Sequence, residues 1–365
     1  MKNGRKQSLV VLAALIVLAT AAAVVWLTMS AAAPPTPEPP IPSIEKRVTG
    51  PAPAAPRPAP AATVAAARPG SEPQRDPGVV FTAGWGSAPG ELGHDIPEEG
   101  APEGPMSFVV DSRGRVFVLD QINRRVQIFE PGKPPRIIPL DRDTFQDLAL
   151  RGDGGLALLD RLAGKELVLL DDQGAETGRV PLVGDGVSEG GAATALFQRD
   201  DGAWVEVEHR ELVRLTDAEG RADPKRPSLT GRPTPDGRSL LRARLQRPST
   251  AVVTILPVAG GPPREMRVDF ALRVGHLVAL AADASGRIFV AAHLMRLRDG
   301  PPYDVLESRL ELVVLDTAGE ELARQRLPAP GGPEEQFRSI RVGADGAVYQ
   351  LVLDESGATM RRWTL

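Results

Sequence analysis

From about Pro77 to the end of the chain, short apolar runs alternate with turns that contain Asp and Gly, as in SFVVDSRGRVFVLD between residues 107 and 120. The runs are short and rich in Val, Ile, Leu and Phe, a pattern that predicts β-strands rather than helices. Runs such as VFVL (116–119) and LALL (156–159) have no polar alternation. We therefore expect sheets that are buried on both faces, as when sheets stack against one another.

The turns recur along the chain. A turn that contains Asp and Gly ends at Gly114, Gly154, Gly202, Gly237, Gly286 and Gly346. A second turn follows most of these, at Gly132, Gly174, Gly220, Gly260 and Gly319. Two hairpin turns per repeat indicate a four-stranded antiparallel blade, and six repeats predict an all-β, six-bladed β-propeller. The fourth repeat is degenerate and the fifth contains an insertion, so seven blades remain an alternative.

The last repeat is one strand short. Its strands are predicted at 339–342, 348–353 and 359–363, after which the chain stops. An apolar run from Val79 to Thr82 has no partner in its own neighbourhood. Because a closed ring leaves no free sheet edge, we expect residues 78–83 to supply the outer strand of the last blade. The propeller would then comprise residues 78–365.

The stretch from Phe81 to Phe129 resembles an NHL repeat, a repeat that forms propeller blades. The matching positions are Pro105, Asp111 to Gly114, Asp120, Asn123, Arg125, Val126 and Phe129. The resemblance is close in this first repeat only. It implies that Asp120 and Arg125 support the turn of their own blade. It also implies a metal-holding role for loops near the channel where such propellers are enzymes, as in the amidating lyase and the calcium-dependent lactonases.

The N-terminal part of the chain has a different character. Residues 1–30 combine a basic flank with the apolar run 9–29, which is long enough to cross the roughly 30 Å hydrocarbon layer as a helix. Residues 31–77 are rich in Pro and Ala and predict a disordered linker. We expect a single-pass anchor in a bacterial inner membrane, with the N-terminus cytoplasmic and the propeller periplasmic. A cleaved signal peptide is the alternative, which would make the protein periplasmic or secreted.

Composition narrows the classes of function. The formal net charge is −4, so we expect no nucleic-acid partner, because such proteins usually carry a basic excess. Cysteine is absent, which excludes disulfides, thiolate metal sites and a cysteine nucleophile. No motif indicates a cofactor, and we expect none.

Five polar residues at or near the ends of predicted second strands are candidates for a metal site: Asp120, Asp160, Glu208, His209 and His293. In a propeller these strand ends share one face near the channel. Carboxylates together with imidazole can hold Ca²⁺ or Zn²⁺, which defines an alternative function as a metal-dependent hydrolase or lyase. However, blades four to six offer no matching carboxylate, and Asp120 has a structural explanation. Our interpretation is therefore that the chain has no metal site.

The insertion from Leu294 to Ser308, between the second and third strands of the fifth blade, is the most suggestive feature for binding. The candidate binding residues are Arg124, Met295, Arg296, Arg298 and Tyr303, because Tyr, Arg and Met are enriched at interfaces. An extended hairpin that packs on its own blade is the alternative. Elsewhere, Arg242, Arg244 and Arg247 on one predicted strand form either a basic stripe or a solvated edge.

These features favour a non-enzymatic propeller that binds or scaffolds a partner outside the cytoplasm. The tether, the spacer, the rigid ring and the lack of an assembled catalytic set all support this interpretation. The expected partner is a protein, a peptide or a cell-envelope polymer. Besides the metal-dependent enzyme, a structural member of an envelope complex without a small ligand is a third alternative, because a propeller fold alone does not determine function.

Overall fold

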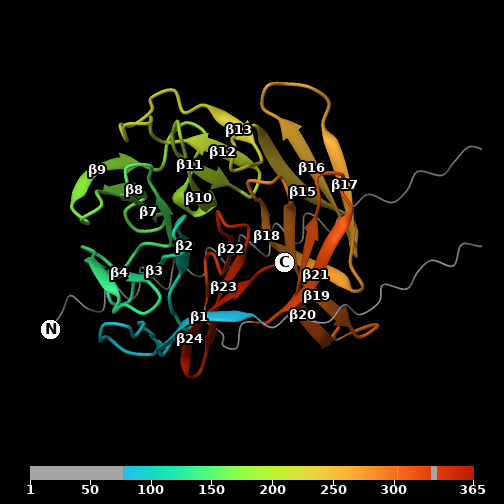
Figure 1. Cartoon of the computed structure of the whole chain (residues 1–365), viewed down its shortest axis with the longest axis horizontal. Coiled ribbons are helices and arrows are strands. Elements are labelled where there is room, and N and C mark those ends of the chain that lie inside the picture. Colours follow the sequence, from blue (N-terminus) through green and yellow to red (C-terminus); the bar gives the residue numbers. More distant parts are fainter. Residues whose placement is uncertain (1–76, 302, 330–334) are drawn as a thin grey trace, which may run out of the picture. The chain divides into compact units, whose positions relative to one another are not determined.

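The computed structural model describes residues 77–301, 303–329 and 335–365. They form six antiparallel sheets of four strands each, which are arranged as the blades of a β-propeller (Figure 1). The chain divides into two units, 1–66 and 67–365, and every described residue belongs to the second. The predicted anchor at 9–29 and nearly all of the predicted linker lie outside the described residues. Within the described part, no helix is long and apolar enough to span a membrane.

The first three blades follow one another along the chain. Blade 1 contains β2 (Ser107–Val110), β3 (Val116–Asp120), β4 (Arg125–Phe129) and β5 (Arg136–Pro139). Blade 2 contains β6 (Asp147–Leu150), β7 (Leu156–Asp160), β8 (Glu166–Leu170) and β9 (Glu176–Pro181). After the short 3₁₀ helix η1 (Gly190–Ala192), blade 3 contains β10 (Ala193–Arg199), β11 (Gly202–Val207), β12 (Glu211–Arg214) and β13 (Ser228–Thr230).

The last three blades complete the ring. Blade 4 contains β14 (Arg232–Pro233), β15 (Ser239–Arg247), β16 (Thr250–Pro257) and β17 (Arg264–Asp269). Blade 5 contains β18 (Arg273–Ala282), β19 (Ile288–Leu297), β20 (Val305–Leu315) and β21 (Glu321–Leu327). Blade 6 contains β22 (Ile340–Val342), β23 (Val348–Asp354), β24 (Gly357–Trp363) and β1 (Gly78–Gly84). The prediction of six four-stranded blades is confirmed, and the alternative of seven blades is wrong.

Blade 6 combines the two ends of the described chain. β1 pairs antiparallel with β24, with Thr82 opposite Thr359, which is the pairing expected for the apolar run from Val79. The ring of Phe81 stacks on that of Phe129 in blade 1, with the ring centroids 3.8 Å apart. The closing strand therefore pairs within blade 6 and also packs against blade 1.

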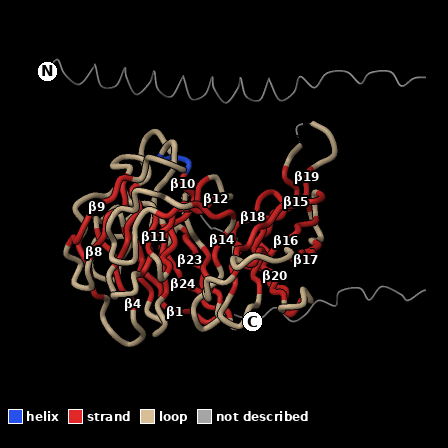
Figure 2. Tube along the Cα trace, turned by 90° about the horizontal axis from the view of Figure 1, so that it is seen from above, coloured by secondary structure: helices blue, strands red, loops and turns tan. Residues whose placement is uncertain are grey.

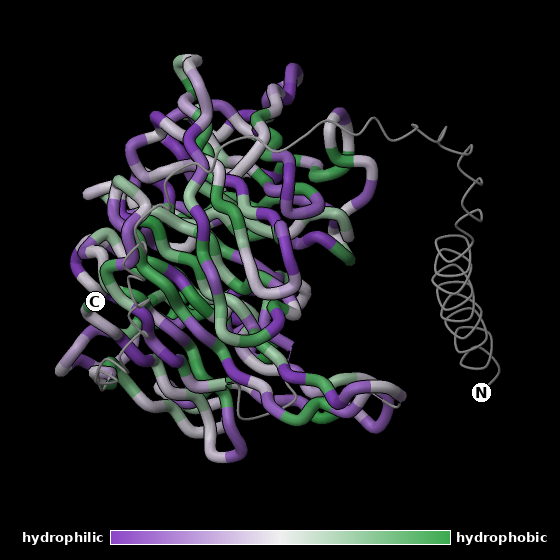
Figure 3. The backbone as a smooth tube through the Cα atoms, turned by 90° about the vertical axis from the view of Figure 1, so that its right-hand side faces the viewer, coloured by the Kyte–Doolittle hydropathy of each residue, from purple (hydrophilic) through white to green (hydrophobic). Residues whose placement is uncertain are grey.

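Hydrophobic side chains fill the space between neighbouring blades. All five residues of β3 and all five of β7 are buried, and side chains from blades 1 and 2 share one core cluster that includes Phe117, Leu119 and Leu158. In Figure 3 hydrophobic residues are frequent along the strands and hydrophilic residues are frequent at the loops. The uninterrupted apolar runs therefore reflect sheets that are covered on both faces.

The recurring turns are built by a carboxylate that accepts backbone N–H groups. Oδ1 of Asp111 accepts hydrogen bonds from the backbone N–H of Arg113 (2.9 Å) and Arg115 (2.8 Å), and Gly114 has φ +79°. The same two hydrogen bonds occur at Asp171, Asp217, Asp283 and Asp316. Such turns need only residues that are close in sequence, so they can be recognised without the fold.

The first strand of each blade lies nearest to the centre. These inner strands are β2, β6, β10, β14, β18 and β22, and several of them contact one another. Because neighbouring strands are antiparallel, the turns between second and third strands lie on the same face of the ring as the connections between blades. We call this the upper face.

Replacing Phe81 by Ala should lower the free energy of unfolding by about 1–3 kcal/mol, less than the roughly 3–5 kcal/mol of a fully buried phenylalanine. Phe81 is only half-buried, but its ring stacks against blade 1. Urea denaturation of the full chain measures the change. Val79→Ala is the matched control in the same strand, because Val79 is 57% exposed and should change the stability by less than about 0.5 kcal/mol. Equal losses would contradict a closing role for the Phe81 stack.

Candidate functional site

A cavity of about 1590 Å³ lies among the inner strands, lined by residues of blades 2 to 6. Eight arginines and four aspartates line it, an excess of four positive charges in a chain whose formal net charge is −4. The arginines are Arg151, Arg199, Arg210, Arg232, Arg242, Arg244, Arg338 and Arg341. The aspartates are Asp153, Asp200, Asp201 and Asp236. We call this space the central cavity.

One fully buried carboxylate, that of Asp147, connects four blades beside the central cavity. Its Oδ1 accepts hydrogen bonds from the hydroxyl of Ser107 in blade 1 (2.6 Å) and from Nη2 of Arg341 in blade 6 (2.7 Å). Its Oδ2 accepts the backbone N–H of Leu196 in blade 3 (2.8 Å) and lies 3.5 Å from Nη1 of Arg338. Asp147 itself begins β6 of blade 2, so two arginines and the inner strands of three other blades meet at this one side chain.

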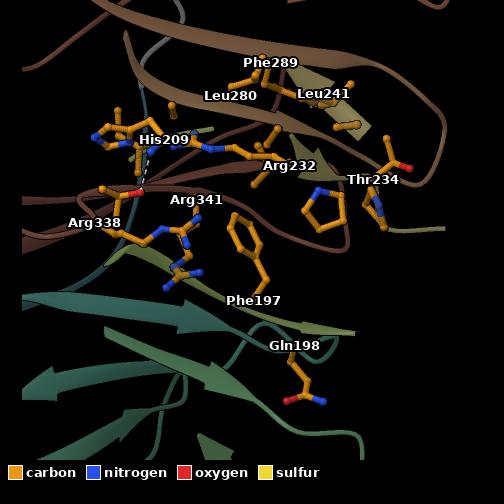
Figure 4. Close-up of a pocket in the computed structure, with 18 of the residues that line it drawn as sticks. Phe197, Gln198, His209, Arg232, Thr234, Leu241, Leu280, Phe289, Arg338 and Arg341 are labelled. Atoms are coloured by element: carbon orange, nitrogen blue, oxygen red, sulfur yellow. Dashed lines mark hydrogen bonds between the residues drawn. The ribbon is translucent and has the colours of Figure 1, made fainter. Parts of the chain in front are cut away.

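Arg338 and Arg341 are largely buried cations beside each other. Burial and then repulsion from Arg338 lower the pKa of Arg341 from 12.5 to about 9, and burial lowers the pKa of Arg338 as well. The guanidinium group of arginine is not deprotonated at neutral pH in proteins, so both side chains are cations. The Arg338 guanidinium lies over the ring of Phe197, 4.9 Å from its centroid. Figure 4 shows Arg338, Arg341 and Phe197 together.

The orientation of Arg341 leaves part of its hydrogen-bonding capacity unused. Nη2 also donates to the backbone carbonyl of Leu148 (3.1 Å). Its Nε is buried and has no hydrogen-bond partner in the part of the chain that the structure describes. A buried donor without a partner lowers the free energy of unfolding by about 1–3 kcal/mol. The orientation of Arg341 therefore makes the fold less stable.

A second buried carboxylate, Glu206 on β11, holds the third arginine. Nε and Nη2 of Arg232 donate to the two oxygens of Glu206 (2.6 and 3.0 Å), and the hydroxyl of Thr194 donates to Oε2 (2.9 Å). Nδ1 of His209 lies 3.5 Å from the same oxygen. Burial opposes ionisation of Glu206, but hydrogen bonds from His209 and Arg232 outweigh it and hold its pKa well below 4.5.

Asp120 and Asp160, which the sequence suggested as metal ligands, hold the turns of their own blades and the connections that lead into those blades. Asp120 is fully buried and accepts hydrogen bonds from Nε of Arg125 (2.7 Å), the backbone N–H of Gly93 (2.8 Å) and the side chain of Asn123. Asp160 accepts hydrogen bonds from the hydroxyl of Thr144 (2.5 Å) and from the backbone N–H of Ala163 (3.0 Å). The support of a blade turn by Asp120 and Arg125 is therefore seen directly.

Of the other three candidates, two lie on the upper face and one lies within a strand. Glu208 and His209 form the exposed turn after β11, and both have positive φ (51° and 56°). His293 lies inside β19 rather than at its end, because that strand continues to Leu297. Over residues 77–301, 303–329 and 335–365, no three His, Asp or Glu side chains are grouped to hold a metal ion.

One expectation about these strand ends was wrong. Blade 6 does have a carboxylate at the end of its second strand, because β23 ends at Asp354. The Asp354 side chain accepts hydrogen bonds from the backbone N–H (2.8 Å) and the hydroxyl (2.5 Å) of Ser356. It therefore supports its own turn, like Asp120 in blade 1.

The insertion at 294–308 is mostly a continuation of two strands. β19 and β20 pair as far as Leu297 and Val305, so the loop proper spans only 298–304, and the hairpin stands out in Figure 2. Arg296 is ion-paired with Glu307 (3.2 Å) and Arg298 with Asp304 (3.2 Å). Tyr303 is 59% exposed.

The remaining candidate binding residues lie apart along the chain. Met295 is half-buried on β19. Arg124, in the turn between β3 and β4 of blade 1, is ion-paired with Asp143 (3.1 Å). Arg124 belongs to blade 1 and the hairpin to blade 5, and no ion pair or hydrogen bond joins them in the part of the chain that the structure describes.

The arginines of the central cavity were largely missed in the sequence. Arg242 and Arg244, noted as a basic stripe, do line it, but Arg232, Arg338 and Arg341 were not singled out. Two signals were available. Asp147 directly precedes the apolar run 148–150. Arg338 precedes the strand predicted at 339–342, and Arg341 lies within it.

No protein-family model matches the sequence, and no curated protein matches it. Many solved structures are similar in fold. They include a streptogramin B lyase (10% identity, TM-score 0.40, covering 74% of this chain and 96% of that one). A virginiamycin B lyase from Staphylococcus aureus is also similar, with 10% identity and a TM-score of 0.38, covering 72% of this chain and 95% of that one. The calcium-binding protein regucalcin from Agrobacterium tumefaciens has 14% identity and a TM-score of 0.40, covering 70% of this chain and 90% of that one. At these identities the likeness concerns the propeller fold alone.

Replacing Glu206 by Gln should lower the free energy of unfolding by about 3 kcal/mol at pH 7, because it leaves Arg232 without its buried counter-ion. The lowered pKa of Glu206 stabilises the fold above the unfolded pKa of 4.5, and this contribution is lost as the pH falls through the folded value. The difference between wild type and variant should therefore shrink below about pH 4. Urea denaturation across a pH series measures it.

Glu219→Gln is the matched control. Glu219 is also ion-paired with an arginine, but its side chain is 65% exposed, and exposed pairs contribute little. A difference between wild type and Glu206→Gln that stays constant from pH 7 to pH 3 would contradict the assigned role of the carboxylate.

Proposed function

We propose that the propeller is a non-enzymatic recognition module that binds an anionic partner in its central cavity. The observation that carries the proposal is the excess of positive charge around the cavity of an acidic chain. Among the described residues the excess is four on the lining itself, and two when Asp147 and Glu206, the buried partners of three of these arginines, are included. Guanidinium groups bind carboxylates and phosphates through paired, charge-assisted hydrogen bonds. A concave site lined by one sign of charge also concentrates ligands of the opposite sign. The partner is therefore a protein, peptide or envelope polymer that presents carboxylate or phosphate groups.

Arg338 and Arg341 are the residues that we assign to the anion. They are already oriented by Asp147, so binding does not have to order two flexible side chains, and less affinity is lost to entropy. Asp147 balances only one of the two charges. Arg232 lies nearby and, together with Arg338 and Arg341, gives three arginines against the carboxylates of Asp147 and Glu206.

This proposal is preferred to a metal-dependent hydrolase or lyase. The carboxylates that such an enzyme would use in blades 1 and 2, Asp120 and Asp160, already accept hydrogen bonds within their blades. A structural member of an envelope complex without a ligand is separated from our proposal by the experiment below. The exposed hairpin tip with Arg296, Arg298 and Tyr303 is retained as a second contact surface for a macromolecular partner.

The test is a calorimetric titration of the full chain with a hexaglutamate peptide, carried out at low and at high salt. Arg338→Gln should raise Kd by roughly ten- to hundredfold, because a hydrogen bond to a charged group contributes about 1.5–3 kcal/mol. Inorganic phosphate as a competitor distinguishes a general oxyanion site from one that selects carboxylates. Arg221→Gln is the matched control, since Arg221 is 74% exposed, does not line the cavity and should leave Kd unchanged.

Two results would overturn the proposal. Hexaglutamate binding that is equally weakened by Arg221→Gln would indicate a diffuse surface effect. Absence of binding by both hexaglutamate and phosphate, in protein whose melting temperature shows that it is folded, would favour the structural role without a ligand.

We further propose that the propeller lies in the bacterial periplasm, held by residues 9–29 in the inner membrane. The basic flank, the long apolar run and the Pro/Ala-rich stretch support this placement. An alkaline phosphatase fused to the C-terminus should be active, because that enzyme needs disulfides that form outside the cytoplasm. Full-length protein in the membrane fraction indicates a retained anchor, and a shortened soluble product indicates a cleaved signal. An inactive fusion would contradict the placement.

A further inference from the structure

Two histidines and a methionine share one face of blade 5, where β18 pairs with β19. His276 lies directly opposite His293 in the strand register, and their rings stack with centroids 5.2 Å apart. Met295 follows His293 by two residues, so both side chains are on the same face of β19. Leu294 between them is fully buried on the other face. Three soft or borderline donors are thus presented together.

A glycine leaves room for two of these side chains. A Cβ atom at Gly275 would lie 2.4 Å from Cε of Met295 and 3.4 Å from Nδ1 of His293. The methionine methyl group and the imidazole nitrogen therefore both border the space that a side chain at position 275 would fill. The register of β18 against β19 shifts between Val274 and His276, so the strand is irregular at this place, as is common at functional positions in sheets.

The two nitrogens of His293 have different environments. Nε2 is 2.7 Å from the hydroxyl of Ser308, whereas Nδ1 is buried and has no hydrogen-bond partner among the described residues. When Nε2–H donates to Ser308, Nδ1 carries a free lone pair. Histidines that bind metals have this arrangement, in which a hydrogen bond at one nitrogen fixes the tautomer and the other nitrogen is the ligand.

The donor set indicates the class of metal. Two imidazoles and a thioether favour a soft monovalent ion such as Cu(I), whereas Ca²⁺ and Mg²⁺ need oxygen ligands. Because the chain has no cysteine, methionine is its only source of a sulfur ligand.

We propose that His276, His293 and Met295 form a copper(I) site, with His293 binding through Nδ1. The site does not depend on the anion-binding arginines, although His276 also lines the central cavity. A bound Cu(I) ion would therefore add a positive charge at the edge of that cavity.

The experiment titrates the full-length protein with Cu(I) under anaerobic reducing conditions, in competition with the coloured Cu(I) chelator bicinchoninate. The wild-type protein should take up one Cu(I) ion per chain from the bicinchoninate complex. Met295→Leu and His293→Gln should each weaken binding by about ten- to hundredfold, the range found when groups supporting a metal site are removed. Met295→Leu conserves volume and should fold normally. Met266→Leu is the matched control, because Met266 is buried in blade 4, and it should leave copper affinity unchanged.

X-ray absorption of the copper-loaded protein gives a readout independent of affinity. Wild type and Met266→Leu should show one sulfur neighbour of the copper, and Met295→Leu should show none. Copper that the chelator removes completely from wild type would overturn the proposal. So would binding that Met295→Leu and His293→Gln both leave unchanged, because the ion would then be adventitious.

Discussion

The carboxylate of Asp147 is the constraint on which the centre of the propeller depends. It is fully buried and binds partners from three other blades: Ser107, Leu196 and Arg341. A buried charge without partners would cost several kcal/mol, so these inner strands have to keep the spacing that brings their donors to it. Asp147 thereby sets the distance between neighbouring blades around the cavity and, at the same time, fixes the arginines that face it.

A polar centre of this kind is not the most stable solution. Replacing a buried ion pair by well-packed apolar residues is often neutral or stabilising, and the chain fills the spaces between blades with apolar side chains elsewhere. Arg341 also lowers the stability, because its buried Nε has no hydrogen-bond partner among the described residues and burial opposes its charge. Residues that break a local rule of stability in this way are expected at functional sites, which supports assigning recognition to the cavity rather than to the outer strands.

The fold was predictable because its signals are local. Asp–Gly turns, such as the one at Asp111, form within five residues, and runs such as 116–119 show their burial by composition alone. The closing strand was predictable because the last repeat lacked a strand and the apolar run from Val79 lacked a partner. The interpretation of residues 1–77, including the anchor and the linker, stays a prediction, as does the resemblance to NHL repeats.

The site was not predictable for the opposite reason. Asp147 and Arg341 are 194 residues apart in the sequence, and no spacing rule links them before the ring is closed. The metal hypothesis was based on residues at equivalent strand ends of successive blades. Residues at equivalent positions of a repeat often have the same structural role, and here Asp120 and Asp160 both support turns. The copper hypothesis likewise depends on a cross-strand register, since His276 and Met295 are brought together only when β18 pairs with β19.

The central claim is that the arginine pair held by Asp147 makes the cavity an oxyanion site. The most direct test is anomalous diffraction from crystals of the protein soaked in selenate, whose selenium marks the position of a bound oxyanion. The account predicts a selenium peak within hydrogen-bonding reach of Arg338 and Arg341, which disappears in Arg338→Gln crystals. Selenate bound only at outer-surface arginines, with none in the cavity, would contradict it.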